Sequence, residues 1–273
     1  MNFHVYHIQS GILKQYVQYI LFNYCDDKHY KGVVRSFANT NYCLGITKDI
    51  QLQKAECGKT FMRTKAGLHS YITGIYLSPF NFIASGMQDE ICIDFTPLGY
   101  HHFFRFSPKT FMLHDDILTE AFGKTAAGFF EQVFEQADFK MRGMLIEEFL
   151  KKKLYTFTNA YLSETVALIH QSDGNMTVNA LARQMKSSEK KVFRYFCGHF
   201  DISPKEYIRV VRFRKTLQSL IKRKGKLAAA AYNFGFSDQS HMIRELNFFT
   251  KCTPSKIGTQ IRDVENAVWI NVS

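Results

Sequence analysis

The spacing of apolar residues changes twice along the chain, and each change predicts a different kind of element. Residues 11–23 carry apolar side chains at helical spacing, from Ile12 to Leu21, which predicts a helix. Between Lys31 and Phe111, short β-branched and aromatic runs are separated by Gly, Asn, Asp and Pro, which predicts a sheet. From about Leu118 the helical spacing returns.

The segment after Leu118 predicts two helical stretches. The second ends in Lys151-Lys152-Lys153, and three lysines in a last turn suit the negative end of the helix dipole. We place a domain boundary between Lys153 and Leu162, where the charge of the chain shifts. The first stretch has an apolar stripe that is either core or the face of a dimerisation helix, formed by Phe129, Phe130, Val133 and Phe134.

Capping residues divide the rest of the chain into a series of helices. Ser163 is the candidate N-cap of the first helix, and Thr177 is the candidate N-cap of the second. Glu189 opens a third helix. Ser203-Pro204 begins a long helix, with proline at a first-turn position where it is tolerated.

A shift of 50 residues superposes this helical region on itself. Each copy has a helix with a small Ala near its end, a tight turn, and a second helix with an Arg on its exposed side. The Ala lets two helices cross closely, and Gly235 supplies backbone freedom in the second turn. The repeat therefore predicts two helix-turn-helix units. The matched residues include Ser187 with Ser237, Val192 with Met242, Arg194 with Arg244, Phe196 with Leu246, Pro204 with Pro254, and Leu181-Ala182 with Ala230-Ala231.

Positive charge is concentrated in the same region. The formal net charge is +11; residues 1–159 hold 17 Lys and Arg against 15 Asp and Glu, and residues 160–273 hold 18 against 9. We therefore expect an anionic partner for the C-terminal part, with a solvated basic face as the alternative.

The long helix from Pro204 to Lys222 connects the two copies. At 1.5 Å per residue it spans about 28 Å. A rod of that length can hold two recognition helices about 34 Å apart, one turn of B-DNA, on one face of the duplex. Basic residues on this rod and in the first unit are candidate phosphate contacts: Lys191, Arg209, Arg212, Arg214 and Lys215.

Cysteine usage and hydropathy predict a cytoplasmic protein. The six cysteines are scattered and form no C-x-x-C pair, which argues against a zinc site or a redox motif and fits a reducing compartment. The first twenty residues lack the features of a signal peptide. No stretch approaches 18 uninterrupted apolar residues, so we expect no membrane span.

Residues 235–257, GFSDQSHMIRELNFFTKCTPSKI, preceded by LAAAAYN, resemble the signature of the AraC/XylS family of bacterial transcription regulators. The first copy, beginning LARQMKSSEKKVFRYF, resembles the first helix-turn-helix of that family and its connecting helix. The resemblance covers about 100 residues. It departs at the ends of the recognition helices, where the family has a Gly-type cap and this chain has Asp201 and Lys251. A left-handed cap position tolerates Asp but costs more with Lys.

The resemblance implies the organisation of the whole chain. Residues 160–262 would be an all-α double helix-turn-helix domain that binds DNA, and residues 263–273 a tail. Residues 1–155 would be a sensor, regulatory and dimerisation domain, which resembles the variable N-terminal domains of the family only weakly, in ICIDFTPLGYHHFFRFSP. By analogy, we expect an α+β fold there, with a cupin-like mixed sheet and flanking helices.

The resemblance also implies partners. Double-stranded promoter or operator DNA is the first of these, and RNA polymerase and a second copy of the chain are further candidates. The 26 phenylalanines either form a Phe-rich core or line a dry pocket for a small apolar effector in the N-terminal part. We expect no cofactor.

The outer faces of the two recognition helices hold the candidate base contacts, because Val192, Phe196, Met242 and Leu246 are expected to face inward. Arg is the commonest reader of guanine, Gln pairs with adenine, and Phe touches the thymine methyl group. The alternatives are a solvated basic face, a partly buried Phe193 and a plain surface histidine at His241. By position in the motif, the base-facing candidates are Lys190, Phe193 and Arg194, followed by Gln239, Ser240, His241 and Arg244.

Other candidate chemistry is sparse. His101 and His102, taken as strand residues, would point to opposite faces and could not share a metal; with His69 and His114 they lack the order of a cupin metal site. We expect no metal. Carboxylate pairs next to turn signals, such as Asp89-Glu90 and Asp115-Asp116, are expected to be loop residues. Because hydrolase, zinc-protease and phosphate-loop motifs are missing from the sequence, we expect no enzyme.

Three functions are compatible with these features. The first is a sequence-specific transcription regulator controlled by its N-terminal part. The second is a non-specific architectural DNA-binding protein, which would lack a specificity ratio over random DNA. The third is a small-molecule-binding protein with an incidental basic helical region.

Overall fold

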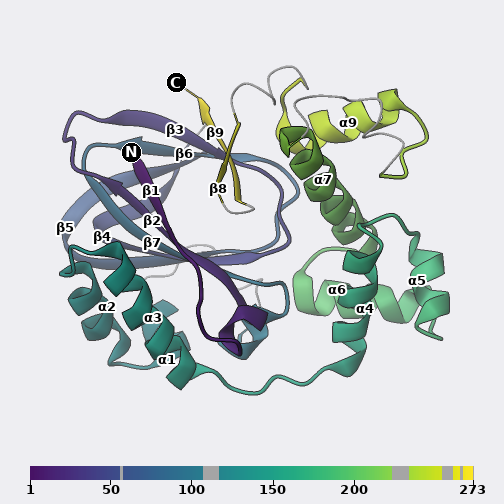
Figure 1. Cartoon of the computed structure of the whole chain (residues 1–273), viewed down its shortest axis with the longest axis horizontal. Coiled ribbons are helices and arrows are strands. Elements are labelled where there is room, and N and C mark those ends of the chain that lie inside the picture. Colours follow the sequence, from purple (N-terminus) through teal and green to yellow (C-terminus); the bar gives the residue numbers. More distant parts are fainter. Residues whose placement is uncertain (56–57, 107–116, 223–233, 254–260, 265–266, 273) are drawn as a thin grey trace.

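The structure is a computed structural model that describes residues 1–55, 58–106, 117–222, 234–253, 261–264 and 267–272 (Figure 1). Its strands are β1 (Asn2–Tyr6), β2 (Val17–Cys25), β3 (Lys31–Ser36), β4 (Tyr42–Ala55), β5 (Gly58–Thr73), β6 (Phe80–Ser85), β7 (Gln88–Phe95), β8 (Ile261–Val264) and β9 (Ala267–Val272). They form one sheet in the order β1-β2-β7-β4-β5-β6-β3-β9-β8. Neighbouring strands are antiparallel except β5 and β6, so the expected mixed sheet is confirmed.

The sheet curls so that strands from its two ends face each other. Phe3 and Asn23 belong to β1 and β2 at one end of the strand order, whereas Val34 and Phe82 belong to β3 and β6 towards the other end. All four side chains line one pocket, which a flat sheet would not allow. The strands of the C-terminal end take part as well, because β9 pairs with β3 from Val33 opposite Val272 to Ser36 opposite Trp269.

The helix predicted over residues 11–23 is wrong. A short 3₁₀ helix, Leu13–Gln15, is followed by β2, which pairs with β1 on one side and β7 on the other. Residues 19–22 of β2 are buried one after another, so both faces of this strand are covered. A strand covered on both faces is apolar at consecutive positions, and such a run also satisfies helical spacing.

The helices α1 (Ile117–Phe122), α2 (Ala126–Phe134) and α3 (Phe139–Lys153) lie beside the sheet (Figure 1). Arg142 of α3 donates to both carboxylate oxygens of Asp89 on β7, at 2.6 and 2.9 Å. Glu147 of α3 accepts a 2.8 Å hydrogen bond from the hydroxyl of Tyr6 on β1. In α2, Phe130, Val133 and Phe134 are buried. Of the two alternatives for this apolar stripe, core or dimerisation face, the structure shows the core.

The helical part begins with α4 (Ala160–Gln171), followed by α5 (Val178–Gln184), α6 (Glu189–Phe200), α7 (Pro204–Lys222) and α9 (Gln239–Thr250). Thr177 caps α5 as predicted, with its side chain accepting from the amide of Ala180. The predicted cap at Ser163 is wrong, because Asn159 caps α4 one turn earlier through the amide of Leu162. The all-α part that was expected to follow the α+β part is confirmed from α4 to α9, and the strands β8 and β9 come after it in the chain.

Two predictions about polar residues are also wrong. His101 and His102 lie in a 3₁₀ helix, Gly99–His102, and not in a strand. Asp89 and Glu90 are not loop residues but part of β7, where Glu90 is buried. Asp115, Asp116 and His114 lie outside the described residues. After Gln88 two acidic residues precede the apolar run Ile91–Ile93. A strand with a buried acidic residue is uncommon enough to be mistaken for a turn.

Candidate nucleic-acid interface

The first helix-turn-helix unit consists of α5 and α6. Ser188 caps α6 by accepting from the amide of Lys191. The turn between the helices includes Lys186, whose φ of 46° lies in the left-handed region. Val192 and Phe196 of α6 are buried, as are Leu181 and Ala182 of α5, so the two helices share a small apolar core.

The second unit repeats the first at the predicted offset of 50 residues. α6 covers 189–200 and α9 covers 239–250, so the two recognition helices have the same length and the same register. Asp238 caps α9 through the amide of His241. Met242 and Leu246 are buried at the positions of Val192 and Phe196. Ala230-Ala231 and Pro254 of the repeat lie outside the described residues.

Both recognition helices end in a left-handed residue at matching positions. The C-caps are Asp201, with φ of 60°, and Lys251, with φ of 53°. Non-glycine residues therefore occupy the left-handed cap position at the end of both helices. Because an L-residue with a Cβ is strained there, these two sites cost folding free energy, and Lys costs more than Asp.

α7 lies between the two units, with α6 and α9 near its opposite ends (Figure 1). It has 19 residues, which corresponds to about 28 Å along its axis. The geometry is that of a rod holding one recognition helix at each end. A groove between the units is lined by residues of both, including Asn179, Glu189 and His241.

The candidate base contacts are on the outside of both units. Lys190 and Arg194 are exposed, and Phe193 is 53% exposed, so its side chain is not a core residue. In the second unit Gln239, Ser240 and Arg244 are exposed. His241 is half-buried, with its ring against Phe236 and its Nδ1 within 3.2 Å of the hydroxyl of Ser237.

The candidate phosphate contacts have partners within the protein. Arg209 donates to Glu245, and Lys215 forms an exposed ion pair with Asp173 at 2.8 Å. Two other candidates lie over aromatic rings: Lys191 is 4.5 Å from the ring centre of Tyr161, and Arg212 is 5.1 Å from the ring centre of Phe236. Burial raises the pKa of Asp94, and the positive charge of Arg214 acts against this rise. Their contact with phosphate stays a prediction.

The N-terminal part touches both units. Phe37 and Ala38, which follow β3, belong to the same apolar cluster as Phe213 of α7 and Met242 and Leu246 of α9. At the other unit, the ring of His101 stacks on Phe157 at 4.8 Å and meets the ring of His199 edge-on at 5.4 Å. A change in the N-terminal part therefore has a direct structural route to each recognition helix.

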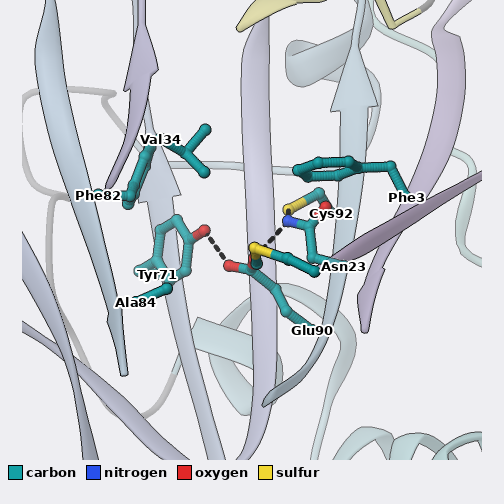
Figure 2. Close-up of a pocket in the computed structure, with 9 residues that line it drawn as sticks. Phe3, Asn23, Val34, Tyr71, Phe82, Ala84, Glu90 and Cys92 are labelled. Atoms are coloured by element: carbon teal, nitrogen blue, oxygen red, sulfur yellow. Dashed lines mark hydrogen bonds between the residues drawn. The ribbon is translucent and has the colours of Figure 1, made fainter. Parts of the chain in front are cut away.

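A second candidate site lies inside the curled sheet, where Glu90 of β7 faces Tyr71 of β5 and Asn23 of β2 (Figure 2). Sequence reasoning missed this site. The signal was present: Glu90, Cys92 and Asp94 are two residues apart, and a period of two places them on one face of a strand. Within the described part of the chain, no group of three or more His, Cys, Asp or Glu residues is placed to hold a metal ion.

A family model described as "Helix-turn-helix domain" matches residues 181–260. This stretch includes the turn of the first unit, both recognition helices and the connecting helix. The helical part of the chain is thus similar to helix-turn-helix domains of the kind found in transcription regulators. Within the matched residues, α6 and α9 are the second helices of the two units.

Individual proteins resemble the chain as well. The Msm operon regulatory protein of Streptococcus mutans is 30% identical over 130 residues, which are 46% of each chain, so the match spans less than half of that curated relative. An AraC-type regulator structure from Chromobacterium violaceum has 20% identity and a TM-score of 0.34, covering 37% of this chain and 90% of that one. ToxT from Vibrio cholerae has 12% identity and a TM-score of 0.49, covering 87% of this chain and 97% of that one. Among the described helices, none is long and apolar enough to cross a membrane.

Proposed function

We propose that the chain is a sequence-specific DNA-binding transcription regulator. Residues 160–262 would bind two adjacent major-groove segments of promoter DNA through α6 and α9, and residues 1–155 would control that binding by taking up a small effector. The segment 263–273 would attach the end of the DNA-binding region to the sheet. Contacts with RNA polymerase and with a second copy of the chain stay predictions.

The observation that supports this proposal most strongly is the correspondence between α6 and α9. Two helices of equal length, with caps, buried residues and end residues at an offset of 50, each present an exposed Arg at the same position, Arg194 and Arg244. A single basic surface for non-specific binding would not require this register. Two recognition helices joined by a connecting helix of about 28 Å fit two major-groove segments one turn of B-DNA apart.

The contacts between the parts support control by the N-terminal part. Phe37 and Ala38 pack with residues of α7 and α9, and His101 contacts the end of α6. A ligand that moves the sheet relative to α7 would change the relative placement of the two recognition helices. Because both must fit the duplex at once, a small change in that placement would alter affinity for DNA.

Selection of bound duplexes from a random pool by the full chain tests the proposal. We expect enrichment of two short sequence elements about one helical turn apart, with affinity that falls steeply as salt rises. Binding without enrichment would favour the architectural alternative. No binding to any duplex at low salt would leave the small-molecule alternative, in which the basic helical region is incidental.

A further inference from the structure

We propose that Glu189, the first residue of α6, contacts a cytosine in the DNA segment bound by the first unit, and that Asn179 holds its carboxylate in place. The inference rests on the proposed function, because it concerns the same interface. It adds a base-contacting residue that the sequence motif did not indicate, and it names the base that this residue selects.

The repeat places Glu189 and Gln239 at the same position. α6 begins at Glu189 and α9 begins at Gln239, and each helix has 12 residues. Val192 and Met242 are buried at matching positions, so the two helices turn the same faces inward and the same faces outward. Gln239 is a candidate base contact of the second unit. By the same register, α6 presents Glu189 where α9 presents Gln239.

The carboxylate of Glu189 is open to a partner outside the protein. The residue is exposed, and it lines the groove between the two units. Recognition helices of helix-turn-helix domains contact base edges with residues near their N-terminal ends. Glu189 belongs to that end of α6 and directly precedes Lys190, which is itself a candidate base contact.

Asn179 fixes the direction of this carboxylate. Its side-chain amide donates a 2.8 Å hydrogen bond to Oε1 of Glu189, from the first turn of α5 to the first turn of α6. The donor is the amide nitrogen, because an ionised carboxylate accepts hydrogen bonds and donates none. Among the residues that the structure describes, none donates a hydrogen bond to the other oxygen, Oε2. That oxygen is therefore positioned for a donor on the DNA.

The negative charge of Glu189 has no cation beside it in the described part of the chain. Glu245, which lines the same groove, is paired with Arg209 through two hydrogen bonds, whereas no ion pair of Glu189 is present among the described residues. Near the phosphates of a duplex, an unpaired carboxylate is repelled and lowers affinity for every sequence. A glutamate at this position is therefore costly unless it gains a specific donor.

Cytosine is the base that supplies such a donor. Its edge in the major groove presents the N4 amino group, from which Glu and Asp side chains accept a hydrogen bond. Guanine presents two acceptors, and thymine presents an acceptor and a methyl group, so neither donates to a carboxylate. Adenine presents an amino group beside the acceptor N7, a pattern that suits the amide of Gln better than two carboxylate oxygens. The acceptor-only chemistry of Glu189 thus selects cytosine.

A structural role for the pair would have different consequences. A carboxylate at the N-terminal end of a helix interacts favourably with the helix dipole, and the bond to Asn179 ties α5 to α6. Both effects stabilise the fold, and neither depends on the sequence of the DNA. The base preference at a single position therefore separates a base contact from a structural residue.

Glu189→Gln tests the proposal, because it changes the chemistry of the side chain and keeps its size. The glutamine oxygen can still accept from Asn179, and the new amide donor suits N7 of adenine. Selection from a random pool, by the full chain and by this variant, should show one base pair at which the preferred base changes from cytosine to adenine. The ratio of affinities for the two duplexes should shift about fivefold or more. An unchanged preference at every base pair would overturn the proposal.

Two further variants separate position from charge. Asn179→Ala should lower the preference for cytosine at the same base pair by about two- to tenfold and leave the other base pairs unchanged. Glu164→Gln removes the same charge from an exposed residue of α4 and should change no base preference. Circular dichroism and thermal melting check that each variant is folded. A shift from cytosine to adenine in Glu164→Gln would refute the assignment to Glu189, and an unchanged preference in Asn179→Ala would refute the positioning role of Asn179.

The inference and the proposed function fail in different ways. If the wild-type chain selects two elements and Glu189→Gln selects the same bases, the proposed function stands and Glu189 is a structural residue. If the wild-type chain enriches no sequence, the proposed function is wrong and the role of Glu189 is wrong with it. A shift at one base pair in Glu189→Gln supports both.

Discussion

Arg209 of α7 donates two hydrogen bonds to Glu245 of α9, from Nε at 3.0 Å and from Nη2 at 2.7 Å. The side chains are 26% and 14% exposed, so the pair is partly shielded from water. A two-point contact between a planar guanidinium and a carboxylate fixes orientation as well as distance. The second recognition helix is thereby held to the connecting helix, and its angle to the first unit depends on this ion pair.

A double-mutant cycle measures this connection. With Arg209→Ala, Glu245→Ala and the double variant, we expect a coupling of about 1–3 kcal/mol in the free energy of unfolding, because both partners are partly desolvated. The exposed pair of Lys215 with Asp173, treated in the same way, should couple by less than about 1 kcal/mol. Equal coupling in the two pairs would mean that Arg209 does not anchor α9.

Arg194 and Lys191 lie next to each other on α6 but should affect DNA binding differently. Arg194 is exposed and is a proposed base contact, whereas Lys191 lies over the ring of Tyr161. Arg194→Ala should lose about 1–3 kcal/mol of preference at one base pair. Lys191→Ala should weaken binding to all duplexes alike and reduce the slope of log affinity against log salt by about one.

Binding curves on the selected duplex, on single-base variants of it and on random DNA separate these effects. If Arg194→Ala weakens specific and random duplexes by the same factor, Arg194 contacts the backbone and does not read a base. If Lys191→Ala changes the order of preference among the single-base variants, its assignment to phosphate is wrong.

The helical part could be predicted from the sequence far better than the sheet. Caps such as Thr177, the repeat offset and the inward positions Val192 and Met242 are local signals, and the structure confirms them. Strand β2 was mistaken for a helix because burial on both of its faces removed the alternation that marks a strand.

The pocket around Glu90 could not be predicted from local signals. Asn23, Tyr71 and Glu90 are distant in the sequence and meet only because β2, β4, β5 and β7 are neighbours in the sheet. Strand order depends on non-local pairing, which no single segment encodes. The spacing of Glu90 and Cys92 was the local sign of the site. It places both residues on one face of a strand but does not indicate which residues that face contacts.

Lys251 ends α9 in a left-handed conformation, and glycine should fit there better. Lys251→Gly removes the Cβ strain at φ of 53° and should stabilise the chain by about 0.5–1 kcal/mol. The matching change Asp201→Gly, at φ of 60°, should give a smaller gain because Asp tolerates this region. Urea unfolding of both variants checks the order. A loss of stability in Lys251→Gly would show that the contact of Lys251 with the ring of Phe248 outweighs the strain.

His101 should make the contact with the first unit sensitive to acid. Burial lowers the pKa of His101 from 6.5 to about 4, with the nearby His199 adding to the effect. Between these values the unfolded chain binds a proton that the folded chain does not, so stability falls as pH falls. The wild type should lose up to about 3 kcal/mol relative to His101→Gln between pH 7 and pH 4.

Urea unfolding at several pH values measures this difference. The exposed His29 serves as the control, since His29→Gln should leave the pH dependence of the wild type unchanged. Parallel curves for the wild type and His101→Gln would show that His101 is not held neutral in the folded chain.

Gly45→Ala should disrupt the polar end of the pocket without altering any of its polar groups. The new Cβ would lie 2.1 Å from the ring of Tyr71, so the ring must move and its hydrogen bond to Glu90 is lost. Overpacking of this kind costs about 1–3 kcal/mol in the free energy of unfolding.

Gly198→Ala is the matched control. A Cβ at this helical position meets nothing within 4 Å, and alanine there should stabilise the chain by about 0.5–1 kcal/mol. Opposite signs for the two changes are expected in thermal or urea unfolding. If Gly45→Ala is as well tolerated as Gly198→Ala, Tyr71 does not depend on an open path over β4, and the role assigned to Gly45 is wrong.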